Sequence, residues 1–229
     1  MKIEDFFTQK TDVEKKCWDY IYRDILLAHQ GGIIQVNFKK YLEKNPQAKF
    51  PAYRFLELTS NELKKEIFTE NEFLSGITIK GNVLNSTKPF FIQYYDELGK
   101  PPFMIDNVVD FTITDAINLN EWGDWLPKKA KSIYISVCNL TSLHGIHKKL
   151  KSCKKLGIMF APIKSSILGL MLIQGLEEFS FISEGFTDQE REASKAMSEI
   201  INNGLRKHQD VFEVQDALIA RGLKEYAKL

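Results

Sequence analysis

Pairs of apolar residues recur every 22 or 23 residues along the middle of this 229-residue chain. The four pairs are Phe111/Ile113, Ile133/Ile135, Leu156/Ile158 and Phe179/Phe181. An apolar residue at every second position is typical of a short strand with one buried face. A fixed period of this length indicates stacked structural repeats, in which each unit buries its apolar face against its neighbours. This recurrence constrains the fold more than any other feature of the chain.

Two further columns follow the same period. Three and five residues after the second apolar position, the units carry Ala116, Cys138, Ala161, Glu184 and Asn118, Leu140, Ile163, Phe186. The unit that begins at Ile133 fits the pattern L-x-L-x-x-N/C-x-L without a gap. The chain therefore resembles leucine-rich-repeat proteins, of the degenerate kind found in bacterial and tailed-phage proteins.

This resemblance implies an α/β fold built on a short leucine-rich-repeat-like solenoid, with the paired apolar residues pointing into its core. We expect the coils at 107–186, a mixed α/β region at 1–106 and a helical C-terminal cap at 187–229. An ordinary parallel α/β sheet with coincidental spacing is the alternative. Whether residues 1–106 form a separate domain or a second cap stays open.

The N-terminal region mixes helix and strand signals. Thr11 and Glu14 form a capping box that predicts the start of a helix, and further helices are expected near 38–42 and 59–68. Gly81-Asn82 suits a hairpin turn. Together with the strand-like residues between 90 and 105, it predicts a small antiparallel element.

The C-terminal region reads as two helices. Thr187 and Glu190 form another capping box, and Asn203-Gly204 predicts the end of that helix. A second helix is expected over about 210–220, where apolar residues recur at helical spacing.

The charge of the chain is unevenly distributed. The net charge is +1, yet the segment Trp125–Gln174 contains nine lysines and no acidic residue. The rest of the chain is therefore acidic, with a net charge of −8. Such a block indicates an acidic partner, an internal docking surface, or a solvated face that keeps a solenoid soluble.

The cysteine content and the termini bear on location. Three cysteines, Cys17, Cys138 and Cys153, cannot form a closed disulfide framework, so we expect reduced thiols and a cytoplasmic protein. The first residues carry acids where an export signal has its apolar stretch. No apolar run reaches the roughly 18 residues of a membrane span, so no membrane association is expected.

Catalytic and metal-binding motifs are weak. Cys138, His144, His147 and Cys153 are zinc-type donors, but they lack the tight cysteine pair of most zinc sites, so we expect no metal and no cofactor. The chain has no nucleophile elbow, phosphate-binding loop or His-Glu-x-x-His motif. We assign no catalytic residue and lean against an enzyme, although one with a site in the N-terminal half stays open.

Two binding functions remain. Leucine-rich repeats generally bind proteins through the outward residues of their strands, here Thr112, Thr114, Tyr134, Ser136, Met159 and Ser180. The first hypothesis is a protein-interaction module, in a phage-encoded factor for host takeover or anti-defence. The alternative is polyanion or nucleic-acid binding through Lys128, Lys129, Lys131, Lys148, Lys149, Lys151, Lys154 and Lys155, within the lysine-rich block 128–164.

Overall fold

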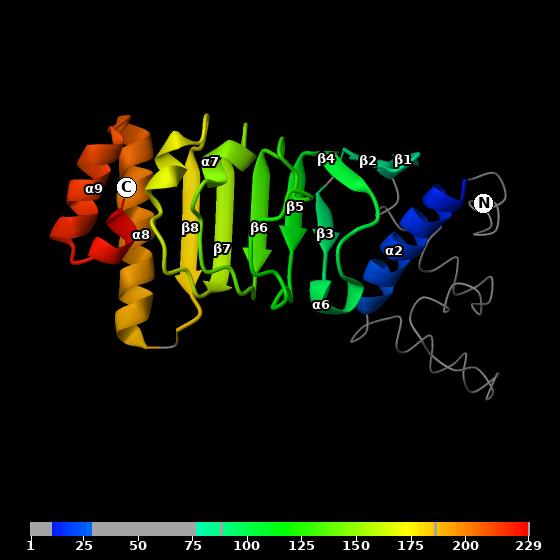
Figure 1. Cartoon of the computed structure of the whole chain (residues 1–229), viewed down its shortest axis with the longest axis horizontal. Helices are drawn as coiled ribbons and strands as arrows, with labels where there is room; N and C mark the ends of the chain where they lie inside the picture. The colour runs from blue at the N-terminus through cyan, green and yellow to red at the C-terminus, as the bar shows by residue number, and fades with distance from the viewer. Residues whose placement is uncertain (1–10, 29–76, 88, 186, 229) are drawn as a thin grey trace.

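The computed structural model describes residues 11–28, 77–87, 89–185 and 187–228. Within these residues the chain is mixed α/β, with a five-stranded all-parallel sheet, a three-stranded sheet and helices at both ends (Figure 1). The predicted α/β class is confirmed. The helices predicted near 38–42 and 59–68 lie outside the described residues.

The five-stranded sheet follows chain order. Its strands are β3 (Phe90–Ile92), β5 (Asp110–Ile113), β6 (Ser132–Ser136), β7 (Lys155–Ala161) and β8 (Glu178–Ser183). Each strand is parallel to the next, and the first apolar residues of the predicted pairs face one another in register. That row is Phe111, Ile133, Leu156 and Phe179. The spacing of the sequence is therefore the spacing of neighbouring strands.

Strand β3 corrects the prediction of a small antiparallel element. Phe90 pairs in parallel with Phe111 of β5, so β3 belongs to the large sheet. The sheet thus begins upstream of residue 107, where we expected the coils to start. The reason is that Phe90 and Ile92 are both buried and extend the apolar columns by one more strand.

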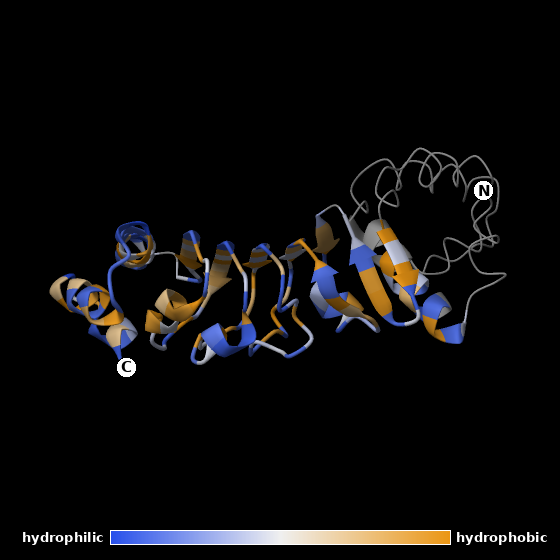
Figure 2. Ribbon diagram, turned by 90° about the horizontal axis from the view of Figure 1, so that it is seen from above, coloured by the Kyte–Doolittle hydropathy of each residue, from blue (hydrophilic) through white to orange (hydrophobic). Residues whose placement is uncertain are grey.

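The inner face of the sheet packs against the segments that connect its strands. These segments contain the short helices α7 (Ile146–Lys149) and η4 (Leu168–Leu172). Figure 2 shows the strands as one row and the connecting segments as a second row beneath them. The paired apolar residues of β5 to β8 are at most 4 % exposed, so the core lies between the two rows.

Each strand from β3 to β7 is followed by a residue in the left-handed region that is not glycine. These residues are Tyr94, Asp115, Val137 and Phe160, with φ between 49° and 56°. Backbone bonds from neighbouring segments hold this turn: the Ala116 amide donates to Val137 O at 2.8 Å, and the Val137 amide donates to Met159 O at 2.9 Å. The stacking therefore imposes a conformation that the side chains themselves disfavour.

The second sheet lies beside β3. It contains the hairpin of β1 (Ile77–Lys80) and β2 (Val83–Ser86), as predicted, and β4 (Met104–Val108), which is parallel to β2. Helix α2 (Asp12–Ala28) begins with the predicted capping box. Its Tyr20 hydroxyl donates to Gly99 O at 2.6 Å, just after α6 (Tyr95–Leu98), which ties the helix to this end of the molecule.

The C-terminal helices are α8 (Asp188–Lys207), α9 (Val211–Ala220) and the short η5 (Lys224–Ala227). The predicted capping box at Thr187 is present, but the prediction that α8 ends at Gly204 is wrong. A Cβ at Gly204 would lie 2.5 Å from Val214 of α9 and 3.1 Å from Met171. Gly204 is therefore a point of close helix packing inside α8, and His208 ends the helix in the left-handed region.

Helix α8 covers the outer edge of β8 with side-chain hydrogen bonds. The backbone amides of Phe179, Phe181 and Ser183 donate to Asn202, Ser198 and Ser194, at 2.7, 3.0 and 2.9 Å. Two residues of strand advance about 6.6 Å, and four residues of helix advance about 6 Å. The two periods match closely enough for three consecutive bonds, so this edge is closed to another strand.

Candidate interaction surfaces

The outer face of the large sheet carries a row of five residues in register. They are Phe91, Thr112, Tyr134, Gly157 and Ser180, one from each strand. Phe91 is 39 % exposed and Tyr134 is 36 % exposed, while Thr112 and Ser180 are half-buried. The row is uncharged, with aromatic rings and hydroxyl groups facing outward.

Tyr134 lies against Gly157 on the neighbouring strand. A Cβ at Gly157 would lie 2.7 Å from Cδ2 of the tyrosine ring and 3.1 Å from the hydroxyl of Ser180. The glycine therefore leaves room for the ring beside the sheet surface. A tyrosine held in this way presents a large contact area at low entropic cost, as anchor residues of protein interfaces do.

The other predicted face residues lie one row further along the strands. Met159 and Thr114 are half-buried, whereas Ser136 is only 9 % exposed and offers little surface. Sequence reasoning missed Phe91, Phe160 and Ile182, each about 40 % exposed. Extending the period back by one unit from Thr112 would have found Phe91. Nothing in the sequence marks the left-handed turn that places Phe160 on the surface.

The structure brings together eight of the nine lysines of the block. They lie at the edge where β6 and β7 begin, either in α7 or in the segments that lead into these strands. Figure 2 views the molecule from this edge. Lys164 follows β7 and lies apart from the other eight.

Part of this lysine edge is neutralised by acids. Lys155 is 3.0 Å from the Glu178 carboxylate, and Lys154 forms an ion pair with Glu177 at 2.5 Å. Lys149 lies 3.4 Å from Asp124, and its ammonium also donates to a backbone oxygen, that of Trp122. These pairs are largely exposed, so each contributes little to stability.

The cysteines and histidines of the block do not converge. Cys138 follows the end of β6, whereas Cys153 precedes β7 at the opposite edge and lies 3.1 Å from Lys155 O. Burial raises the pKa of both thiols to about 11. No group of three or more potential metal ligands occurs among the described residues.

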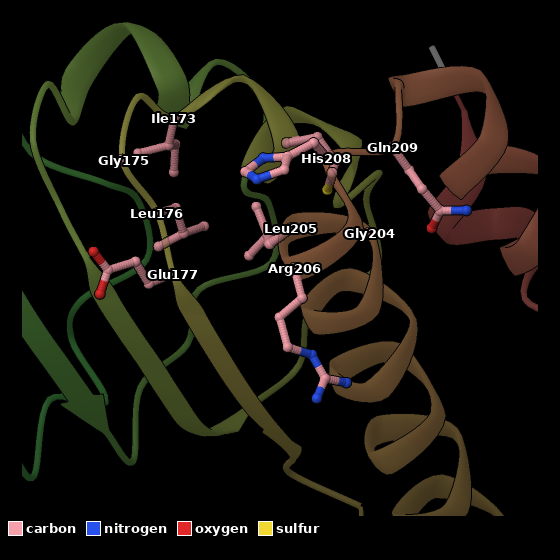
Figure 3. Close-up of a pocket in the computed structure, with 10 residues that line it drawn as sticks. Ile173, Gly175, Leu176, Glu177, Gly204, Leu205, Arg206, His208 and Gln209 are labelled. Carbon is pink, nitrogen blue, oxygen red and sulfur yellow. The ribbon is translucent and has the colours of Figure 1, made fainter.

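A cavity of about 590 Å³ lies between the segment before β8 and the end of α8 (Figure 3). Its walls include Ile173, Leu176 and Leu205. The imidazole of His208 points inward, while the side chains of Arg206 and Glu177 point away from the centre. The cavity therefore offers an apolar surface with one titratable group and no acid–base pair.

The comparisons with known proteins add no identity. No family model, curated protein or solved structure matches this chain. None of the helices in the described part of the chain combines the length and apolarity that a membrane span requires. Functional inference therefore depends on the surfaces described above.

Proposed function

We propose that this chain is a protein-interaction module that binds a partner through the outer face of its five-stranded sheet. The observation that carries the proposal is the uncharged row across five strands, with Tyr134 packed against Gly157 at its centre. An exposed apolar surface of this kind, on a rigid sheet, is typical of a protein-binding site.

The repeated backbone contacts support a leucine-rich-repeat-like solenoid as the scaffold of this surface. Besides the strands, the connecting segments bond to each other at matching positions 23 residues apart. The Lys154 amide donates to Lys131 O at 2.7 Å, and the Glu177 amide donates to Lys154 O at 2.8 Å. Such stacking gives the binding row a regular spacing of about 4.8 Å between side chains.

The chemistry of the row indicates the partner surface. It has no charged side chain, so a complementary surface would bring apolar and hydroxyl groups rather than acids or bases. The resemblance to degenerate repeats of phage proteins makes a host protein the partner class that we propose, in host takeover or anti-defence.

A comparative affinity capture tests this proposal. The wild-type chain is compared with Tyr134→Ala/Met159→Ala and with Phe212→Ala/Ile219→Ala, which removes exposed apolar side chains from α9. We expect a stoichiometric protein that the wild type and the α9 variant retain and the face variant loses. Retention must survive nuclease and high salt. Equal capture by both double variants would contradict the proposal.

A further inference from the structure

Five lysines of the lysine edge have no acidic partner within the described residues. They are Lys128, Lys129, Lys131, Lys148 and Lys151, and we call them the lysine strip. Four of them are exposed and Lys128 is half-buried. These five charges are therefore available to a ligand, in contrast to the paired Lys149, Lys154 and Lys155.

The backbone holds the strip in a fixed arrangement. The Lys151 amide donates to Lys128 O at 3.1 Å, so these two lysines are neighbours on adjacent segments. The Ser152 hydroxyl donates to Lys129 O at 3.2 Å and fixes the same register one residue further on. Neighbouring segments lie about 4.8 Å apart, and like charges at that distance repel each other. The arrangement does not stabilise the fold, but it concentrates positive charge along one line.

Acidic residues frame the strip on both sides. On the β5 side, Asp106 accepts a hydrogen bond from the Lys128 amide at 3.3 Å, and Asp110 begins β5. On the β8 side stand Glu177 and Glu178. The positive surface is thus only two segments wide, and carboxylates limit it in both directions across the sheet.

We propose that the lysine strip binds an acidic segment of a partner protein, an extended run of Asp and Glu side chains. A single extended chain fits a strip two segments wide, with its carboxylates over the lysines. The ammonium groups then supply charge-assisted hydrogen bonds and long-range steering toward the site.

Nucleic acid fits the same surface less well. A duplex, whose major groove alone is about 12 Å wide, would lay phosphates over the framing carboxylates. The segment Trp125–Gln174 contains no arginine, and arginine is the residue best suited to planar phosphate recognition. The ring of Trp125 already stacks on Tyr95 and meets the edge of Phe111, so it is not free to stack on a base.

The lysine strip goes beyond the proposed function, because it lies at the strand-start edge rather than on the outer face. The two surfaces are therefore separable by mutation. Loss of one leaves the other intact if both proposals hold.

Fluorescently labelled deca-glutamate tests the proposal, with a deoxythymidine oligonucleotide of equal charge as the competing ligand. Binding anisotropy is measured with the full chain at about 50 mM and about 200 mM salt. The strip variant is Lys128→Glu/Lys131→Glu/Lys151→Glu. Its matched control is Lys164→Glu/Lys195→Glu/Lys224→Glu, which changes the net charge equally at exposed lysines elsewhere.

We expect the wild type to bind the peptide more tightly than the oligonucleotide. The strip variant should lose at least about tenfold in affinity, the control variant less than about twofold, and Tyr134→Ala/Met159→Ala nothing. Lys→Gln versions of the strip replace the Glu versions if circular dichroism shows unfolding. No binding by the wild type, equal losses in strip and control variants, or tighter binding of the oligonucleotide would overturn the proposal.

Discussion

Asn202 on α8 exchanges two hydrogen bonds with the backbone of Phe179 on β8. Its Oδ1 accepts from the Phe179 amide at 2.7 Å, and its Nδ2 donates to the Phe179 carbonyl at 2.8 Å. A side-chain amide thus replaces the next strand at this position. This exchange lets a parallel sheet end without an open edge, although a helix and a strand have different backbones.

Asn202→Ala should destabilise the fold by about 2 kcal/mol, because it leaves a buried amide and carbonyl without partners. Urea unfolding measures the loss, and hydrogen exchange at the Phe179 amide should accelerate. Asn203→Ala is the control, because this neighbour makes no hydrogen bond to β8 in the described structure. Equal stability of the two variants would show that the side-chain bridge does not hold the edge.

Gly157→Ala should displace the Tyr134 ring and weaken partner binding with little change in stability. The added Cβ would lie 2.7 Å from the ring, which is partly exposed and has room to rotate away. In a Tyr134→Ala background the same substitution should stabilise by about 0.5 kcal/mol, because alanine restricts the unfolded chain more than glycine. Thermal unfolding of the four proteins in this cycle gives the coupling. Additive effects would mean that the ring and the glycine are not in contact.

Regularity explains which parts of the fold the sequence predicts. The apolar columns at Ile133, Leu156 and Phe179 are predictable because one buried face requires an apolar residue at every second position. The capping box at Thr187 is predictable because it is a local exchange of hydrogen bonds. The same 23-residue spacing places Lys154 beside Glu177, so that ion pair was within reach of the sequence.

Tertiary packing decides the rest. Gly204 reads as a helix end in the sequence, yet the close approach of Val214 and Met171 keeps it inside α8. The left-handed Val137 and Phe160 have no turn chemistry of their own. Backbone bonds from adjacent segments determine their conformation, and those bonds exist only once the segments stack. The exposed position of Phe160 was therefore beyond reach.

Val137→Asn should stabilise the protein by about 1 kcal/mol, because a β-branched residue is strained in the left-handed region and asparagine is tolerated there. Val137 has φ 53° and is only half-buried, so little apolar burial is lost. Val137→Thr keeps the branched shape and serves as the control, with no gain expected. Denaturant midpoints measure both. If threonine stabilises as much as asparagine, relief of backbone strain is not the cause.

Stability should fall between about pH 9 and pH 11 because of the buried thiols of Cys138 and Cys153. Burial raises the pKa of each from 9.0 to about 11, so over this range the unfolded chain loses thiol protons that the folded chain retains. The folded state is favoured below pH 9, and each thiol removes on the order of 2 kcal/mol as the pH rises through 11. Urea unfolding at a series of pH values measures the slope, and Cys138→Ala/Cys153→Ala separates the thiols from lysine and tyrosine titration. The double variant should show a flatter profile. An unchanged slope would mean that both thiols ionise in the folded protein as readily as in the unfolded chain.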